Sequence, residues 1–160
     1  MGFQLNIETA DNDDDDTCWH LSSNLGMASL CGIMRTFGML ADPPVPHWPS
    51  ITEFGLTRAD FTAPGEVVPG KEDRLAAVRA AVDAARADAD PHPLGIPRHK
   101  LASQLEQWLI VPGEVTAALT AYDARAAAER ADAERTYPGW SSWLRFLRSA
   151  AAGDHSIRVY

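Results

Sequence analysis

Alternating apolar and polar positions at the two ends of the chain predict two strands. Residues 3–8 read Phe-Gln-Leu-Asn-Ile-Glu and residues 156–160 read Ser-Ile-Arg-Val-Tyr. A period of two places the apolar side chains on one face of a sheet. Because a lone strand leaves its backbone hydrogen-bonding groups unpaired, we expect these two segments to pair with each other.

Helical periodicity fills much of the chain between these strands. Apolar residues three and four positions apart predict about five helices, over residues 24–40, 71–90, 98–110, 112–137 and 140–151. Ser22, Ser23 and Asn24 supply N-caps for the first helix. That helix is apolar on nearly all its faces, which is typical of a buried helix.

Residues 1–160 are expected to form a single globular domain, because this length suits one hydrophobic core. The predicted class is α+β: mainly helical, with a small sheet that pairs the N- and C-terminal strands. Two segments interrupt this pattern, an acidic loop at 10–17 and a Pro-rich irregular connection at 41–70. Proline lacks a backbone donor and fixes φ, so the second segment does not suit a sheet.

Charge is distributed very unevenly along the chain. Of 22 acidic residues, six lie between Glu8 and Asp16 with no basic residue among them. The remaining 16 acidic and 14 basic residues nearly cancel, although the net charge of the chain is -8. The acidity is therefore a local feature, and the balance of charge makes nucleic acid an unexpected partner.

The acidic loop does not match the known metal-binding patterns. A calcium loop that starts at Asp11 would need glycine at its sixth position and glutamate at its twelfth, where Asp16 and Ser22 stand. Cys18 and His20 are separated by one residue, which is not a structural zinc spacing. We therefore expect no metal and no cofactor.

No sequence motif predicts catalytic residues. The chain lacks G-x-S-x-G, the P-loop pattern and G-x-G-x-x-G. A small enzyme with a site near Cys18, His20 and Asp16 stays open as an alternative. A second alternative is a helix-turn-helix DNA-binding protein that uses residues 101–125, although its second helix has no basic residue before Arg125.

The leading interpretation is a non-enzymatic interaction or regulatory protein, such as an accessory or immunity-like factor. Its possible partner-binding residues combine negative charge with an aromatic side chain: Asp13, Asp14, Asp15, Asp16, Trp19 and His20. This combination suits a partner protein with a basic surface, and the alternative is a solvated connector. If Cys18 and His20 hold no metal, Cys18 and Trp19 are expected to pack under the start of the first helix while His20 stays in water.

Membrane association is not expected from the sequence. No apolar run approaches the roughly 20 residues that span a bilayer, and the N-terminus lacks the basic and apolar regions of a signal peptide. We therefore expect a cytoplasmic protein, in which Cys18 and Cys31 stay thiols. The oligomeric state is left open.

The order of elements at both ends resembles a group of prokaryotic proteins. A short strand, a polar loop and the helix SSNLGMASLCGIM open the chain, and GWSSWLRFLRSAA with a closing strand ends it. This arrangement is similar to that of small proteins of actinobacteria and their phages to which no activity is attached. The resemblance covers both ends and not the middle, and it implies a bacterial or phage origin without site residues.

Overall fold

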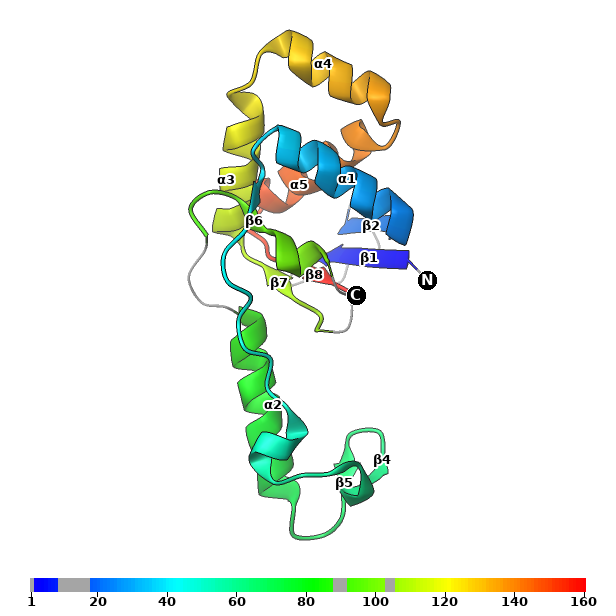
Figure 1. Ribbon diagram of the computed structural model, residues 1–160, viewed down its shortest axis with the longest axis vertical. Helices are drawn as coiled ribbons and strands as arrows, with labels where there is room; N and C mark the ends of the chain where they lie inside the picture. Colours follow the sequence, from blue (N-terminus) through cyan, green and yellow to red (C-terminus); the bar gives the residue numbers. More distant parts are fainter. Residues whose placement is uncertain (1, 9–17, 88–91, 103–105) are drawn as a thin grey trace. The chain divides into compact units, whose positions relative to one another are not determined.

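The computed structural model describes residues 2–8, 18–87, 92–102 and 106–160 (Figure 1). Contacts along the chain divide it into two compact units. The larger unit comprises Met1–Pro44 and Asp90–Tyr160, and the smaller comprises Val45–Ala89. The single-domain interpretation of residues 1–160 stays a prediction.

A four-stranded antiparallel sheet lies in the larger unit. Its strands follow the order β2 (Trp19–Ser23), β1 (Gly2–Ile7), β8 (Ile157–Val159) and β7 (Leu109–Ile110). Leu5 lies opposite Val159, and Ile7 lies opposite Ile157. The predicted pairing of the two ends of the chain, and with it the α+β class, is confirmed.

Helix α1 (Asn24–Thr36) follows β2 directly. The Ser23 hydroxyl accepts a hydrogen bond from the Gly26 N–H at 3.0 Å, as the N-cap pattern predicts. Met27, Leu30 and Met34 are buried, but Leu25 is 78% exposed. The prediction of a helix buried on all sides is therefore wrong, because one face carries small or polar residues and meets solvent.

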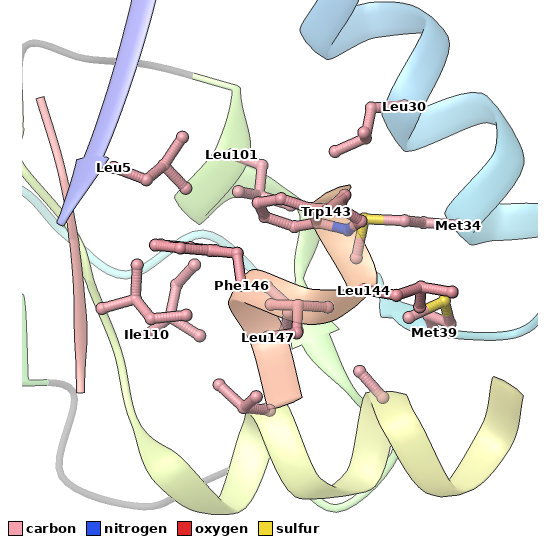
Figure 2. Packing of buried hydrophobic residues seen from close by; sticks show 14 of the residues in the cluster. Leu5, Leu30, Met34, Met39, Leu101, Ile110, Trp143, Leu144, Phe146 and Leu147 are labelled. Atoms are coloured by element: carbon pink, nitrogen blue, oxygen red, sulfur yellow. The ribbon is translucent and has the colours of Figure 1, made fainter. Parts of the chain in front are cut away.

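The core of the larger unit lies between the sheet and its helices (Figure 2). Helix α5 (Trp140–Ala152), which confirms the helix predicted at 140–151, supplies the largest share of buried side chains. Trp143 stacks on Phe146 at 5.6 Å between ring centroids. Leu30 and Met34 approach the same cluster from α1, and Leu5 approaches it from β1. Full burial of one such side chain stabilises the fold by roughly 1.5–3 kcal/mol.

The helix predicted at 98–110 is wrong. Arg98–Leu101 form one 3-10 turn, η4, and Leu109–Ile110 form β7 at the edge of the sheet. Gln107 has a φ of 52°, which no right-handed helix contains. Pairing of β7 with β8 outweighs the helical spacing of the leucines, so the first helix of the supposed helix-turn-helix hairpin is missing from the described residues.

The long helix predicted at 112–137 is instead two helices, α3 (Pro112–Asp123) and α4 (Ala127–Thr136). The break lies at Ala126, whose ψ of 142° is extended rather than helical. Arg125 in this turn donates a hydrogen bond to the Thr36 carbonyl at 2.8 Å. This contact ties the turn to the end of α1.

A short parallel pair also belongs to the larger unit: β3 (Leu40–Ala41) lies beside β6 (Ile96–Pro97). Gly95 precedes β6 with a φ of 130°, and a Cβ there would lie only 2.3 Å from the Met39 carbonyl oxygen. This crossing therefore requires glycine.

The smaller unit contains helix α2 (Glu72–Ala87), which confirms the helix predicted at 71–90. The Pro-rich connection precedes it and consists of short pieces: the 3-10 turns η2 (Ile51–Phe54) and η3 (Arg58–Asp60), and the hairpin of β4 (Phe61–Ala63) and β5 (Glu66–Val67). This hairpin corrects the expectation that the segment does not suit a sheet, because Pro64 lies in the turn and leaves both strands free of proline. Leu56 is buried in this unit, as is Val78 of α2. Arg74 and Arg79 of α2 donate hydrogen bonds to the carbonyls of Gly55 and Gly65.

Helices long and apolar enough to cross a membrane do not occur among the described residues.

Candidate functional site

The face of the sheet that points away from the core, which we call the outer face, carries a cluster of exposed and half-buried side chains. Its members occupy alternate positions of three strands: Gln4 and Asn6 of β1, Trp19 and Leu21 of β2, and Arg158 and Tyr160 at β8 and its end. Phe3, Leu5 and Ile7 occupy the intervening positions of β1 and are buried. The alternation therefore separates the core face from the outer face.

Strand register arranges the outer face in two rows. Asn6 lies opposite both Trp19 and Arg158, and Gln4 lies opposite Leu21. Gln4 also exchanges two backbone hydrogen bonds with Tyr160, at 3.1 and 2.7 Å. Directly opposed side chains lie on the same face and within contact range, so the rows are Trp19–Asn6–Arg158 and Leu21–Gln4–Tyr160.

The outer face exposes unusually large apolar side chains. Trp19 is 42% exposed and Leu21 is 74% exposed, although the two are neighbours on the same side of β2. Tyr160 adds a third large side chain, which is also exposed. Isolated exposed apolar residues are ordinary, but adjacent ones rimmed by polar residues are typical of interaction sites.

His20 lies on the opposite side of β2 and packs against α5. Its ring centroid is 4.9 Å from that of Trp143 and 5.7 Å from that of Phe146. Burial lowers the pKa of His20, because the charged imidazolium loses water that the aromatic rings do not replace. The expectation that Trp19 packs inward while His20 stays in water is therefore reversed.

The predicted aspartates and the two cysteines lie apart from the outer face or outside the described residues. Asp13, Asp14, Asp15 and Asp16 lie outside the described residues. Cys18 is half-buried immediately before β2, and Cys31 is half-buried on α1. Burial raises the pKa of the Cys31 thiol, with Arg98 and Arg35 acting in the opposite direction. Raising the pKa keeps Cys31 a thiol rather than a reactive thiolate.

Groups of three or more His, Cys, Asp or Glu side chains placed to hold a metal ion do not occur within the described residues. The suggested enzymatic cluster of Asp16, Cys18 and His20 is described only in part, because Asp16 lies outside those residues.

A buried ion pair joins η4 to the start of α3. Lys100 donates to both carboxylate oxygens of Glu114, at 2.9 and 3.1 Å, and both side chains are completely buried. Glu114 also accepts a hydrogen bond from the Val111 N–H at 3.1 Å, which satisfies a donor at the first turn of α3. Both charges are completely buried, so the pair does not form part of a surface that a ligand reaches.

A cleft of about 320 Å³ is lined by the end of α1, by the turn that precedes α4, and by α4. Ile33, Phe37 and Ala133 supply its apolar surface. Arg125, Glu129 and Asp132 supply charges of both signs, and two threonines complete the lining. These lining residues include neither histidine nor cysteine.

Sequence reasoning found Trp19 but missed Leu21, Gln4, Asn6 and Tyr160 as its neighbours. The signal for Leu21 was available, because Trp-His-Leu-Ser-Ser alternates large apolar and polar side chains over residues 19–23. The neighbouring residues on β1 and β8 could not be found in this way, because their place beside Trp19 depends on the order of strands in the sheet, and a local sequence pattern does not specify that order.

No protein-family model, no curated protein and no solved structure matches this chain.

Proposed function

We propose that this protein is a non-enzymatic interaction factor of the accessory or immunity-like kind, and that a partner protein docks on the outer face of its sheet. The observation that carries the proposal is the exposure of Trp19 and Leu21 side by side on β2. Tryptophan is among the residues that contribute most to binding energy when a partner covers them. Docking would remove this apolar surface from water.

Charge supports a basic partner. The acidic run that includes Asp13 to Asp16 ends two residues before Cys18, and β2 begins at the residue after Cys18. Exposed charges of one sign attract an oppositely charged partner and raise its association rate. A basic protein surface therefore suits both the composition of this segment and the apolar side chains that follow it.

The enzymatic alternative near Cys18 and His20 has less support. The imidazole of His20 packs on Trp143 and Phe146, where it has aromatic neighbours rather than a substrate-facing position. We therefore place the function at the outer face, on the other side of the same strand.

Site-specific photo-crosslinking in cells of the organism that makes the protein tests this proposal. A photoreactive phenylalanine replaces Leu21 in one variant and Leu94, which is also highly exposed, in a matched control. We expect a covalent adduct of defined mass at position 21 and none at position 94. The same adducts at both positions, or none at position 21, would contradict docking on the outer face.

A further inference from the structure

Building on the proposed function, we infer how the partner binds: an extended basic segment adds to the sheet as a new strand along the free edge of β2. This mode specifies more than contact with Trp19 and Leu21. It requires backbone hydrogen bonds between the partner and β2, and these can be tested separately from side-chain contacts.

The position of β2 in the sheet leaves one of its edges open. The order β2-β1-β8-β7 places β2 at an end, and no strand of the described residues pairs with its other side. The strand is five residues long, which is sufficient for several inter-strand hydrogen bonds.

Hydrogen bonding elsewhere in the sheet shows which backbone groups face this edge. Gln4 directs both its N–H and its C=O to Tyr160, on the β8 side of β1. In an antiparallel pair, bonded and non-bonded positions alternate, so the pair formed by Gln4 and Leu21 is a non-bonded one. The N–H and C=O of Leu21 therefore point away from β1, toward the open edge.

Side chains and backbone of β2 thus present one continuous binding surface. Trp19 is two residues from Leu21 and shares both its outward side chain and its backbone direction. A strand added beside β2 would place alternate side chains next to Trp19 and Leu21 on the outer face. Cross-strand pairs of this kind stabilise sheets through contact between large side chains.

The edge at β2 also lacks the features that usually prevent strand addition. Edge strands are commonly short, or carry lysine or proline. The opposite edge, β7, has only two residues and is followed closely by Pro112. In contrast, Trp-His-Leu-Ser-Ser of β2 contains no proline and neither lysine, arginine, aspartate nor glutamate.

Charge selects a basic segment over a second copy of this chain. A second copy would carry the same net charge of -8 and the same acidic run before β2. Two such copies repel each other, whereas a lysine-rich strand is attracted. The occupant is therefore an extended basic segment of another protein.

Amide hydrogen exchange with a synthetic probe tests strand addition directly. The probe is a blocked octapeptide that alternates lysine or threonine with valine. In the free protein, the amides of His20 and Ser22 should be protected by β1 and the Leu21 amide should exchange rapidly. With saturating peptide, we expect Leu21 to become at least about tenfold more protected while His20 and Ser22 change little.

Two N-methylated forms of the peptide provide a control that does not depend on the folding of any variant. One carries methyl groups on the amides of odd residues and the other on those of even residues, so their compositions match. Only one of these two sets of amides faces β2 in an added strand. We expect one form to bind at least about tenfold more weakly than the other.

Substitutions at Leu21 separate the backbone contribution from the side chain. Leu21→Thr keeps the N–H and a strand-favouring side chain, whereas Leu21→Pro removes the N–H that faces the open edge. We expect the proline variant to bind the peptide at least about tenfold more weakly than the threonine variant. In each variant, slow hydrogen exchange at the His20 and Ser22 amides verifies that β2 still pairs with β1.

Each contrary result has its own meaning. Equal binding of the two methylated peptides, or an unchanged Leu21 amide, would overturn strand addition. No binding at millimolar peptide would do the same, while crosslinking at position 21 would still decide the proposed function. Protection of the Leu21 amide without peptide, together with a dimer in sedimentation, would show that the occupant is a second copy.

Discussion

At the scale of single residues, the Lys100–Glu114 pair stabilises the larger unit at a point where neither charge could be buried alone. Both side chains are shielded from solvent, and the carboxylate also caps α3 through the Val111 N–H. Removal of one partner from such a pair leaves the other as an uncompensated buried charge, at a cost of about 3–5 kcal/mol.

We therefore expect Lys100→Met to lower the free energy of unfolding by about 3–5 kcal/mol. The double variant Lys100→Met with Glu114→Gln should lose less than the sum of the two single variants, because the amide oxygen introduced by Glu114→Gln would still accept from the Val111 N–H without a buried charge. Urea unfolding of the four proteins measures this coupling. Additive losses, or a loss below about 1 kcal/mol for Lys100→Met, would contradict a buried stabilising pair.

Burial of His20 makes a second prediction at this scale. Its pKa is lowered from 6.5, so between 6.5 and its folded pKa the unfolded chain binds more protons than the folded protein. The corresponding stability is fully present above pH 6.5 and is lost as the pH falls through this window. The His20→Gln variant should lose less free energy of unfolding than the wild type between about pH 7.5 and 5.

The other histidines are common to both proteins, so the difference between the two pH profiles isolates His20. An NMR titration of the His20 ring provides a direct check, with an expected midpoint below 6.5. A midpoint at or above 6.5, together with identical pH profiles, would show that the ring is hydrated rather than packed on Trp143.

At the scale of elements, α1 stabilises the fold through one face only. Leu30 is fully buried in the core, whereas Leu25, one turn earlier in the same helix, is 78% exposed. Leu30→Ala should lower the free energy of unfolding by about 2–5 kcal/mol through the lost burial and the cavity it leaves. Leu25→Ala should change it by less than about 0.5 kcal/mol.

Thermal or urea unfolding of this matched pair measures both values. Equal losses would mean that Leu25 is covered, either by this chain or by a second molecule. A loss below about 0.5 kcal/mol for Leu30→Ala would place α1 outside the core.

The periodicity of apolar residues predicted helices and strands correctly where tertiary packing favours the same element as the local sequence pattern. Segments 3–8, 71–90 and 140–151 formed the expected strand and helices, in which the larger apolar side chains recur at the spacing of one face. It failed at 98–110, where Gln107 adopts a left-handed conformation and Leu109 pairs with Arg158. That pairing joins positions about 50 residues apart, and a local pattern does not contain it.

At the scale of the whole molecule, the candidate site depends on strand order. The sequence indicated Trp19 through its neighbouring acidic run, but it assigned the wrong sides to Trp19 and His20. A shift of one residue in a strand exchanges its two faces, so the pairing of Asn6 with Trp19 decides which ring meets solvent. Gln4 and Tyr160 join the site only because β1 lies between β2 and β8.

The proposed docking combines two contributions that should affect different rate constants: apolar contact with Trp19, and attraction by the acidic run that precedes β2 in the sequence. If a partner docks on the outer face as proposed, its contact with Trp19 should set the dissociation rate. If that partner is basic as proposed, the acidic run that precedes β2 in the sequence should set the association rate at low salt. Charge and apolar contact can thus be tested in one experiment.

The most direct test of docking on the outer face measures the kinetics of binding to the partner identified by crosslinking. For Trp19→Ala we expect a dissociation rate at least about tenfold higher than that of the wild type. A second variant replaces all four aspartates from Asp13 to Asp16 by asparagine. For this variant we expect slower association at low salt and a nearly unchanged dissociation rate. Leu94→Ser should match the wild type. If Trp19→Ala binds like the wild type, or if Leu94→Ser loses as much affinity, the outer face is not the docking surface.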